Sequence, residues 1–290
     1  MVLAVTGGHG EFGAAVLTHL KTLTDEPVVA TVRAPGEPRR GGQDEGGGVA
    51  GVEYRPGDFA DPETLARSLE GVDSVLVNAT FFGADPSRRE PLVRAAIGAA
   101  VEAGVGRIVL TSWPQPAAMP TVQDYAALEE AVRESGPQWT NLRMSVGLAD
   151  ALARDVVWGR KSGELVAPAA GAVVTPAALR ELAEASAAVL VQPDFAAEVL
   201  ELSGPDAIGW DELAALAGVS FRAVTDDEFI AYVSGTFQLP DPVARQLAAL
   251  YADFRGPWAS TPTSTLAELL GRPATPGIDA VHQRVSRFPS

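Results

Sequence analysis

The chain has 290 residues, of which 47% are apolar and 20% charged, and its formal net charge is −15. This composition is typical of a globular protein with one large domain or two smaller ones, and it excludes collagen-like, coiled-coil and wholly disordered chains. The acidic balance argues against binding to nucleic acid or to anionic membranes, because like charges repel. The absence of cysteine excludes disulfides, thiolate catalysis and cysteine zinc sites, and with only three histidines we do not expect a multi-histidine metal site.

The sequence carries no sign of a targeting or membrane segment. Met1–Thr6 lacks the basic start, the long apolar stretch and the small-residue cleavage site of a signal peptide. No apolar run approaches the ~18 residues of a membrane-spanning helix. We therefore expect a cytoplasmic protein that makes no membrane contact and is a monomer or a homodimer.

Short apolar runs alternate with amphipathic segments in the first half of the chain. The predicted strands are Val2–Thr6, Val28–Arg33, Val52–Arg55, Ser74–Asn78, Ile108–Ser112 and Trp139–Met144. The predicted helices are Phe12–Leu23, Pro62–Leu69, Arg89–Ala103 and Val122–Ser135, and a long loop covers residues 34–51. Asp61 is the expected N-cap of the second helix. This alternation predicts an α/β fold with a doubly wound parallel sheet, which binds ligands at the carboxyl ends of its strands.

The alternation fades after about residue 150. The predicted helices of this half are Ala151–Arg154, Ala177–Leu190, Trp210–Ala217, Phe229–Phe237 and Pro242–Phe254, and Ala196–Leu202 is a predicted strand. We therefore expect a dinucleotide-binding domain over residues 1–150. Residues 151–290 form a smaller, mainly helical substrate region in this prediction, with one or two strands returning to the main sheet.

A glycine-rich segment links the first predicted strand to the first predicted helix. It reads Thr6-Gly7-Gly8-His9-Gly10-Glu11-Phe12-Gly13. Glycines let the chain turn sharply and bring backbone N–H groups against a pyrophosphate, and the last one lets the helix pack close to the strand. At this junction of a doubly wound pattern, the motif favours a dinucleotide site over a merely structural turn.

The end of the second predicted strand distinguishes between the two nicotinamide cofactors. Sites that prefer NAD place a carboxylate here, whereas sites that prefer NADP place an arginine near the 2′-phosphate. Arg33 occupies this position, and the next carboxylate is Glu37. Arg39 or Arg40 would add to the site if the loop folds over it. The sequence thus favours NADPH over NADH, the alternative being that Arg33 is only a solvated side chain.

The ends of the later strands supply the other candidate site residues. Asp58 is placed to accept a hydrogen bond from the adenine amino group, with Phe59 beside the ring, unless Asp58 only caps a turn. The segment after the fourth strand is expected to line the cofactor and its nicotinamide end. Its cofactor-binding candidates are Asn78, Ala79 and Thr80, and the substrate candidates are Phe81, Phe82, Trp113 and Met144. Aromatic residues in such loops can equally fill the core.

These motifs resemble those of the short-chain dehydrogenase/reductase superfamily, and specifically of its NmrA-like branch. The resemblance covers almost the whole chain and rests on Thr6–Gly13, Val32-Arg33, Gly57–Asp61, Gly71–Leu76, Arg107–Ser112, Ser135–Arg143, Leu202–Pro205 and Leu270–Pro273. It implies a Rossmann fold with a small C-terminal substrate domain. It also implies NAD(P)H-dependent reduction of quinones, benzylic ethers or other aromatic and conjugated substrates. Some members of the branch bind the cofactor as redox sensors without turnover.

One departure from the superfamily's pattern concerns the catalytic dyad. Typical members use Tyr-x-x-x-Lys, in which the tyrosine donates the proton and the lysine lowers its pKa. The matching positions hold Thr121 and Tyr125, and the chain's two lysines, Lys21 and Lys161, lie elsewhere. Tyr125 and Ser112, which matches the serine after the fifth strand, remain as catalytic candidates. The Tyr125 hydroxyl either bonds the ribose or substrate, or the ring only fills the space of the missing lysine.

The leading hypothesis from the sequence is an NADPH-dependent reductase of a quinone-like, aromatic or conjugated carbonyl substrate. Such an acceptor suits a site without the dyad, because the ring stabilises the product oxyanion and solvent can complete the protonation. The alternatives are a sensor of the NADPH/NADP ratio without turnover, and a non-redox enzyme such as a cyclase or epimerase on the same scaffold. No metal is expected to take part.

Overall fold

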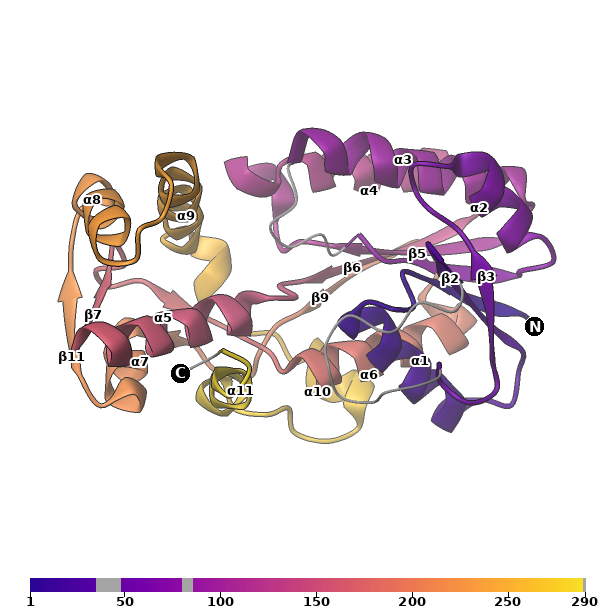
Figure 1. Ribbon diagram of the computed structural model, residues 1–290. Helices are drawn as coiled ribbons and strands as arrows, with labels where there is room; N and C mark the ends of the chain where they lie inside the picture. The colour runs from indigo at the N-terminus through magenta and orange to yellow at the C-terminus, as the bar shows by residue number, and fades with distance from the viewer. Residues whose placement is uncertain (35–47, 80–85, 289–290) are drawn as a thin grey trace. The chain divides into compact units, whose positions relative to one another are not determined.

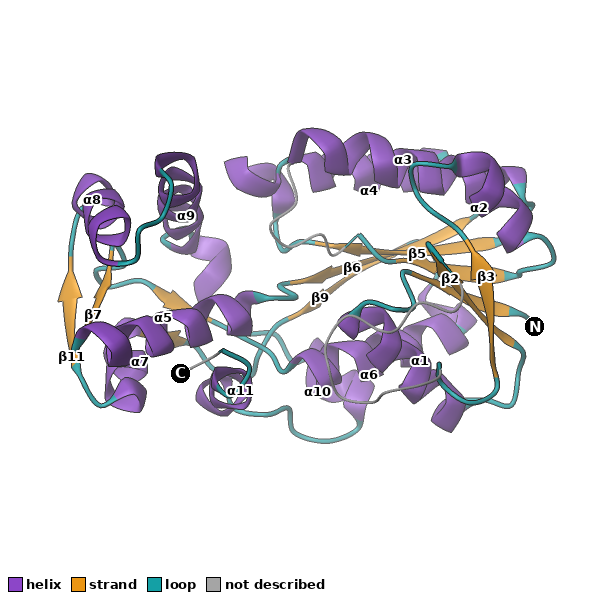
Figure 2. Ribbon diagram, in the orientation of Figure 1, coloured by secondary structure: helices purple, strands orange, loops and turns teal. Residues whose placement is uncertain are grey.

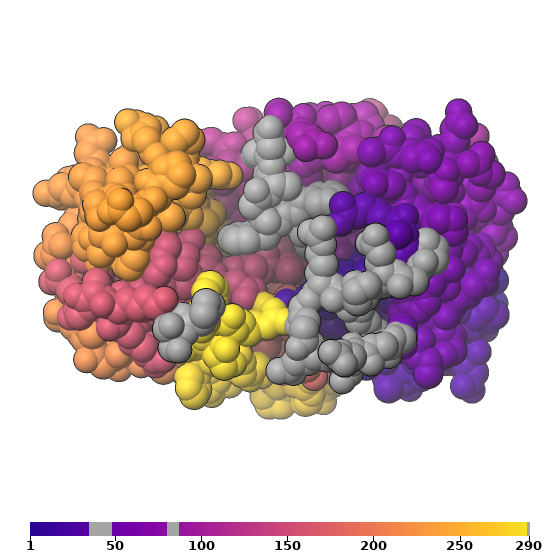
Figure 3. All heavy atoms as spheres, viewed as in Figure 1, coloured from indigo at the N-terminus to yellow at the C-terminus, as the bar shows by residue number. Residues whose placement is uncertain are grey.

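A computed structural model of the chain describes residues 1–34, 48–79 and 86–288. Grey atoms in Figure 3 mark the ranges outside this description. The candidates Thr80, Phe81 and Phe82 fall in one of these ranges, and Glu37, Arg39 and Arg40 fall in another. The chain consists of two compact units, each held together by contacts among its own residues. The first unit contains Met1–Ala117, Val122–Met144 and Arg180–Glu201, and the second contains Ala118–Thr121, Ser145–Leu179 and Leu202–Ser290.

A seven-stranded sheet in the order β3-β2-β1-β4-β5-β6-β9 forms the centre of the first unit (Figure 1). Its strands are β1 (Leu3–Thr6), β2 (Val28–Val32), β3 (Val52–Pro56), β4 (Ser74–Val77), β5 (Arg107–Ser112), β6 (Gln138–Met144) and β9 (Glu198–Leu202). The pairs from β3 through β6 are all parallel. The order reverses between β1 and β4, so the predicted doubly wound α/β fold is confirmed.

Helices cover both faces of this sheet. Figure 2 shows α2, α3 and α4 on one face and α1 and α6 on the other. Their bounds are α1 (Glu11–Leu23), α2 (Pro62–Leu69), α3 (Pro86–Glu102), α4 (Asp124–Glu134) and α6 (Leu179–Val191). Every residue of β1, β2, β4 and β5 is buried, which explains why apolar and β-branched residues dominate their sequences.

Local capping explains why one helix was predicted to the residue and another was not. The Asp61 carboxylate accepts hydrogen bonds from the N–H of Thr64 at 3.1 Å and from its hydroxyl at 2.7 Å, and Pro62 opens α2. By contrast, α5 (Leu148–Ser162) is far longer than the predicted Ala151–Arg154. Its N-cap is Gly147 in the left-handed region, with φ 95°, so no polar capping residue announces its start.

The second unit consists mainly of helices. Besides α5 it contains α7 (Trp210–Ala217), α8 (Asp226–Thr236), α9 (Asp241–Phe254), α10 (Thr265–Leu270) and α11 (Gly277–Val285). Its strands are β7 (Glu164–Ala167), β8 (Val173–Val174), β10 (Ile208–Gly209) and β11 (Ser220–Ala223). The chain also forms the 3-10 turns η1 (Pro116–Ala118), η2 (Pro120–Val122), η3 (Pro193–Phe195) and η4 (Pro257–Ser260). In the described part of the chain no helix is long and apolar enough to cross a membrane.

Aromatic side chains and one buried carboxylate form the core of the second unit. Trp210, Tyr251 and Phe254 are at most 2% exposed. Asp155 accepts hydrogen bonds from the Tyr251 hydroxyl at 2.6 Å and from Trp210 Nε1 at 2.9 Å, and it pairs with Arg154 at 2.9 Å. Burial raises the pKa of the Tyr251 phenol well above its ordinary value. These partners meet the hydrogen-bonding needs of the buried Asp155 carboxylate, so the cluster serves to stabilise the fold.

Candidate functional site

The glycine-rich segment forms a tight turn between β1 and α1. Gly7 has φ +69°, which favours glycine, and the Gly10 N–H donates to the Gly7 carbonyl at 2.9 Å. A Cβ atom at Gly13 would lie only 2.4 Å from the Gly7 carbonyl oxygen, so α1 can approach the turn only with glycine at this position. Glycine is therefore required at position 7 by the positive φ angle and at position 13 by the close approach of the two backbone segments.

This turn, formed by residues 7–13 and called the glycine cradle below, has the features of an anion-binding site. Gly10 is the N-cap of α1 and has no side chain to cap the helix, which leaves the N-cap position without a side-chain acceptor. The helix dipole adds partial positive charge at the same end. A diphosphate fits these features, because it would accept hydrogen bonds from the backbone there. Phe12 is only 4% exposed and packs in the core, whereas Glu11 is half-buried in the first turn of α1.

The carboxyl ends of β1 and β4 meet beside this turn. The Thr6 hydroxyl accepts a hydrogen bond from the Asn78 N–H at 2.8 Å. Asn78 Nδ2 lies 3.5 Å from the position that a Cβ of Gly7 would occupy. The Ala79 N–H donates to the Thr111 hydroxyl at 2.7 Å, which ties the end of β4 to β5. The structure therefore brings together four predicted cofactor-binding residues, Thr6, Gly7, Asn78 and Ala79, at the point where the strand order reverses.

The other side of the turn faces β2 and β3. The Gly8 N–H donates to the Thr31 carbonyl at 3.1 Å, and the exposed Arg33 follows two residues later. The His9 ring lies 5.5 Å from the ring of Tyr54 on β3, measured between centroids. The end of β2 and the glycine turn are thus neighbours.

Asp58 and Phe59 follow β3. Asp58 Oδ1 accepts from the Ala60 N–H at 3.0 Å, and its carbonyl accepts from the Asp61 N–H at 2.9 Å. Asp58 therefore stabilises a turn, and its contact with the adenine amino group stays a prediction. Its side chain and that of Phe59 are half-buried.

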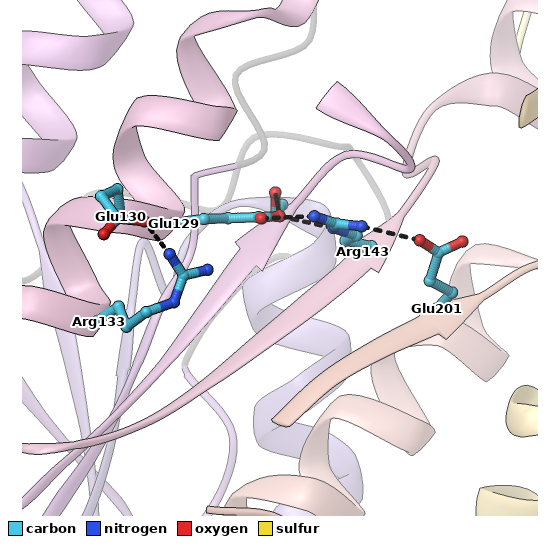
Figure 4. Close-up of polar contacts among 6 residues, drawn as sticks. Glu129, Glu130, Arg133, Arg143 and Glu201 are labelled. Carbon is cyan, nitrogen blue, oxygen red and sulfur yellow. Dashed lines mark hydrogen bonds and ion pairs between the residues drawn. The ribbon is translucent and has the colours of Figure 1, made fainter. Parts of the chain in front are cut away.

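Ser112 donates its hydroxyl proton into a buried ion pair. Its Oγ lies 2.6 Å from Glu129 Oε1, and both side chains are 3% exposed. Arg143 donates to the two oxygens of Glu129 at 2.9 and 2.8 Å, and to Glu201 at 3.0 Å. Figure 4 shows Arg143 between the two carboxylates. The bond to Glu129 raises the pKa of the Arg143 guanidinium, although burial opposes it. Sequence reasoning missed Glu129 and Arg143.

Tyr125 is buried as well, with 3% of its surface exposed. Its hydroxyl donates to the Ala79 carbonyl at 2.5 Å, and the Arg89 guanidinium lies 4.5 Å from its ring centroid. Burial raises the pKa of the Tyr125 phenol above its ordinary value. Thr121, which is predicted to match the superfamily's tyrosine, donates through its N–H and its hydroxyl to Asp253.

The other substrate candidates in the described part of the chain are Trp113, which directly follows β5, and Met144, which ends β6. Trp113 and Met144 are 6% and 1% exposed, and Met144 Sδ lies 4.0 Å from the Ser186 hydroxyl on α6. Lys21 lies in the last turn of α1, at the opposite end from the glycine turn, and Lys161 lies near the end of α5. Across the described ranges, no group of three acidic or histidine side chains could hold a metal ion.

A glycine cradle at the strand switch is the arrangement that binds a dinucleotide, and comparison with known proteins agrees with it. A family model described as NAD(P)H-binding matches residues 7–170, more than half of the chain. The chain belongs to this NAD(P)H-binding family. The match spans the glycine cradle, the Arg33 position and Tyr125.

Reductases of quinones and of dyes are among the proteins that this chain resembles over most of its length. The chain is 26% identical over 283 residues to quinone oxidoreductase 2 of Escherichia coli (strain K12), with 94% of this chain and 95% of that protein covered. It is 27% identical to the NAD(P)H azoreductase of Xenophilus azovorans, with 94% of each chain covered. The structure of the Citrobacter sp. triphenylmethane reductase complexed with NADP(H) matches with a TM-score of 0.81 and 25% identity, covering 98% of this chain and 100% of that one. The family resemblance inferred from the motifs is confirmed.

Proposed function

We propose that the protein is an NADPH-dependent oxidoreductase that transfers hydride to a quinone-like or other conjugated aromatic acceptor. The observation that carries this proposal is the glycine cradle at the point where the strand order reverses, with Gly13 against the Gly7 carbonyl. The quinone, azo-dye and triphenylmethane reductases among the similar proteins support the class of acceptor.

The residues present fit a dinucleotide phosphate. The backbone of the glycine turn and the N-terminus of α1 would hold the diphosphate. Arg33, exposed at the end of β2, would pair with the 2′-phosphate in a forked contact. Asn78 and Ala79 would lie along the middle of the cofactor. When bound, the nicotinamide supplies the hydride.

The hydrogen bonds of Tyr125 and Ser112 support a conjugated acceptor over an ordinary ketone. The Tyr125 proton is engaged with the Ala79 carbonyl, and the Ser112 proton with Glu129. In this arrangement neither hydroxyl is a ready acid for a nascent alkoxide. A reduced quinone or dye needs no such donor, because its ring delocalises the negative charge and solvent can protonate it.

Cofactor preference is tested with the Arg33→Ala variant. Losing a charge-assisted contact of about 1.5–3 kcal/mol weakens NADPH binding about 10- to 100-fold and leaves NADH binding unchanged. Arg67→Ala is the matched control, because Arg67 is an exposed arginine of α2 that donates to the Thr64 hydroxyl of its own helix. An unchanged ratio of NADPH to NADH affinity in Arg33→Ala would refute the assignment.

Turnover is tested by steady-state NADPH oxidation with a panel of quinones, azo dyes and simple aromatic ketones. We expect turnover on the quinones or dyes and little on the ketones. Tight NADPH binding without turnover on any acceptor would instead favour a sensor.

A further inference from the structure

We propose that Tyr125 is a positioning residue and that, together with Arg89 and Asp124, it sets the affinity for NADPH by fixing the carboxyl end of β4. These three residues are called the clasp below. This proposal rests on the proposed function, because it requires the nucleotide to bind beside β4.

The clasp contains a two-bond ion pair and is almost fully buried. Arg89 donates through Nε and Nη2 to the two oxygens of Asp124, both at 2.6 Å. The Arg89 side chain is 6% exposed and the Asp124 side chain 11%. The same guanidinium lies 4.5 Å from the Tyr125 ring centroid, within the range of a cation–π contact. A two-bond arginine–carboxylate pair has one preferred geometry, so it holds the ring in one orientation.

The Tyr125 hydroxyl acts on the backbone at the end of β4. It donates to the Ala79 carbonyl at 2.5 Å, while the Ala79 N–H donates to the Thr111 hydroxyl at 2.7 Å. Ala79 is thus fixed on both of its polar groups, one from α4 and one from β5. A buried carbonyl that lost this donor would incur a desolvation cost, so the contact resists displacement.

The fixed peptide leads directly to the nucleotide cradle. The residue before Ala79 is Asn78, whose N–H donates to the Thr6 hydroxyl at 2.8 Å. Asn78 Nδ2 lies beside Gly7, 3.5 Å from the point where a Cβ atom of that residue would lie. A shift of Ala79 therefore moves Asn78, and with it the polar lining next to the glycine turn.

The same contacts argue against a direct acid role for Tyr125. A phenol has a single proton, and here the proton lies on the bond to Ala79. Burial also disfavours the phenolate and keeps the pKa of Tyr125 above its ordinary value. Tyr125 thus occupies the place of the superfamily's lysine without serving as the acid.

The test compares Tyr125→Phe with Asp124→Asn, which loosens Arg89 and leaves the hydroxyl in place. NADPH dissociation constants, kcat, KM and the pH profile of kcat are measured on each purified variant. We expect about a tenfold loss of NADPH affinity in Tyr125→Phe, the worth of about one buried hydrogen bond. The kcat at saturating NADPH and its pH profile should stay within about twofold of the parent. Asp124→Asn should also weaken NADPH binding, and the two substitutions together should be less than additive, because they act through one contact.

Tyr232→Phe is the control, since it removes a phenol hydroxyl from α8 of the second unit; it should leave NADPH affinity unchanged. A collapse of kcat with intact NADPH affinity in Tyr125→Phe would overturn the inference and assign the proton donor to Tyr125. Parent-like NADPH affinity in both clasp variants would overturn it as well, while leaving the proposed function standing. If the parent protein itself binds no NADPH, the proposed function fails together with the inference.

Discussion

From the buried ion pair of Glu129 and Arg143 we predict how much unfolding free energy is lost when the pair is broken. Glu129 is 3% exposed and accepts three hydrogen bonds, two of them from Arg143 and the third from Ser112. The Arg143→Met change removes the two charge-assisted bonds to Glu129, which stays buried, and also the bond to Glu201. Breaking a buried ion pair from one side costs about 3–5 kcal/mol. We expect a loss near the lower end, about 3 kcal/mol, because Ser112 still donates and the Arg143 side chain is 24% exposed.

The assay is equilibrium unfolding in urea without nucleotide, followed by tryptophan fluorescence. The matched control is Arg133→Met, since Arg133 pairs with Glu130 on the same helix but with 40% and 52% of the two side chains exposed (Figure 4). An exposed pair contributes about 0–1 kcal/mol. Replacing Glu129 and Arg143 together by apolar residues should recover most of the loss, because no charge is then left buried.

A cost below about 1 kcal/mol for Arg143→Met, equal to that of the Arg133 control, would refute this reasoning. It would mean that water reaches Glu129 and solvates it once the arginine is gone. Equal slopes of unfolding free energy against urea in all variants are required for the comparison, because a changed slope would signal an altered unfolded state.

Two further predictions concern the glycine cradle and one titrating group. Gly13→Ala places a methyl group 2.4 Å from the Gly7 carbonyl oxygen and should abolish NADPH binding measured by calorimetry. The control Gly98→Ala lies in open space on α3, so this variant should bind NADPH normally and gain about 0.5–1 kcal/mol of stability. Equal NADPH binding by the two variants would contradict a role of the glycine turn in binding. Burial raises the pKa of Asp253 despite its bonds from Thr121, so the folded protein keeps the proton where the unfolded chain has released it. Stability should therefore fall as the pH rises from the unfolded pKa through the folded one, and Asp253→Asn should flatten this fall in urea unfolding at a series of pH values; identical slopes would count against it.

The sequence predicted those parts of the fold that depend on local signals. The alternation of apolar runs sufficed for the parallel sheet, and Asp61 with Pro62 marked the start of α2. The glycine turn was recognised because its position after β1 limits what it can do. Where no polar cap exists, as at Gly147, the start of α5 was missed.

Contacts between distant segments were beyond prediction from one sequence. Glu129 and Arg143 lie on different elements and are paired only by the packing of α4 against β6. One signal was present, since Glu129 follows Tyr125 by four residues and so shares its buried helix face. The contact of Tyr125 with Ala79 joins α4 to β4, and no spacing in the sequence indicates it.

We propose above that this NAD(P)H-binding chain reduces a conjugated acceptor with NADPH. The most direct measurement is the consumption of NADPH and of a quinone in the same reaction, with NADH in a parallel series. We expect equal molar consumption of the two reactants, faster with NADPH than with NADH, and loss of that preference in Arg33→Ala. Tight binding of NADPH with no consumption of it by any quinone or dye would contradict the account.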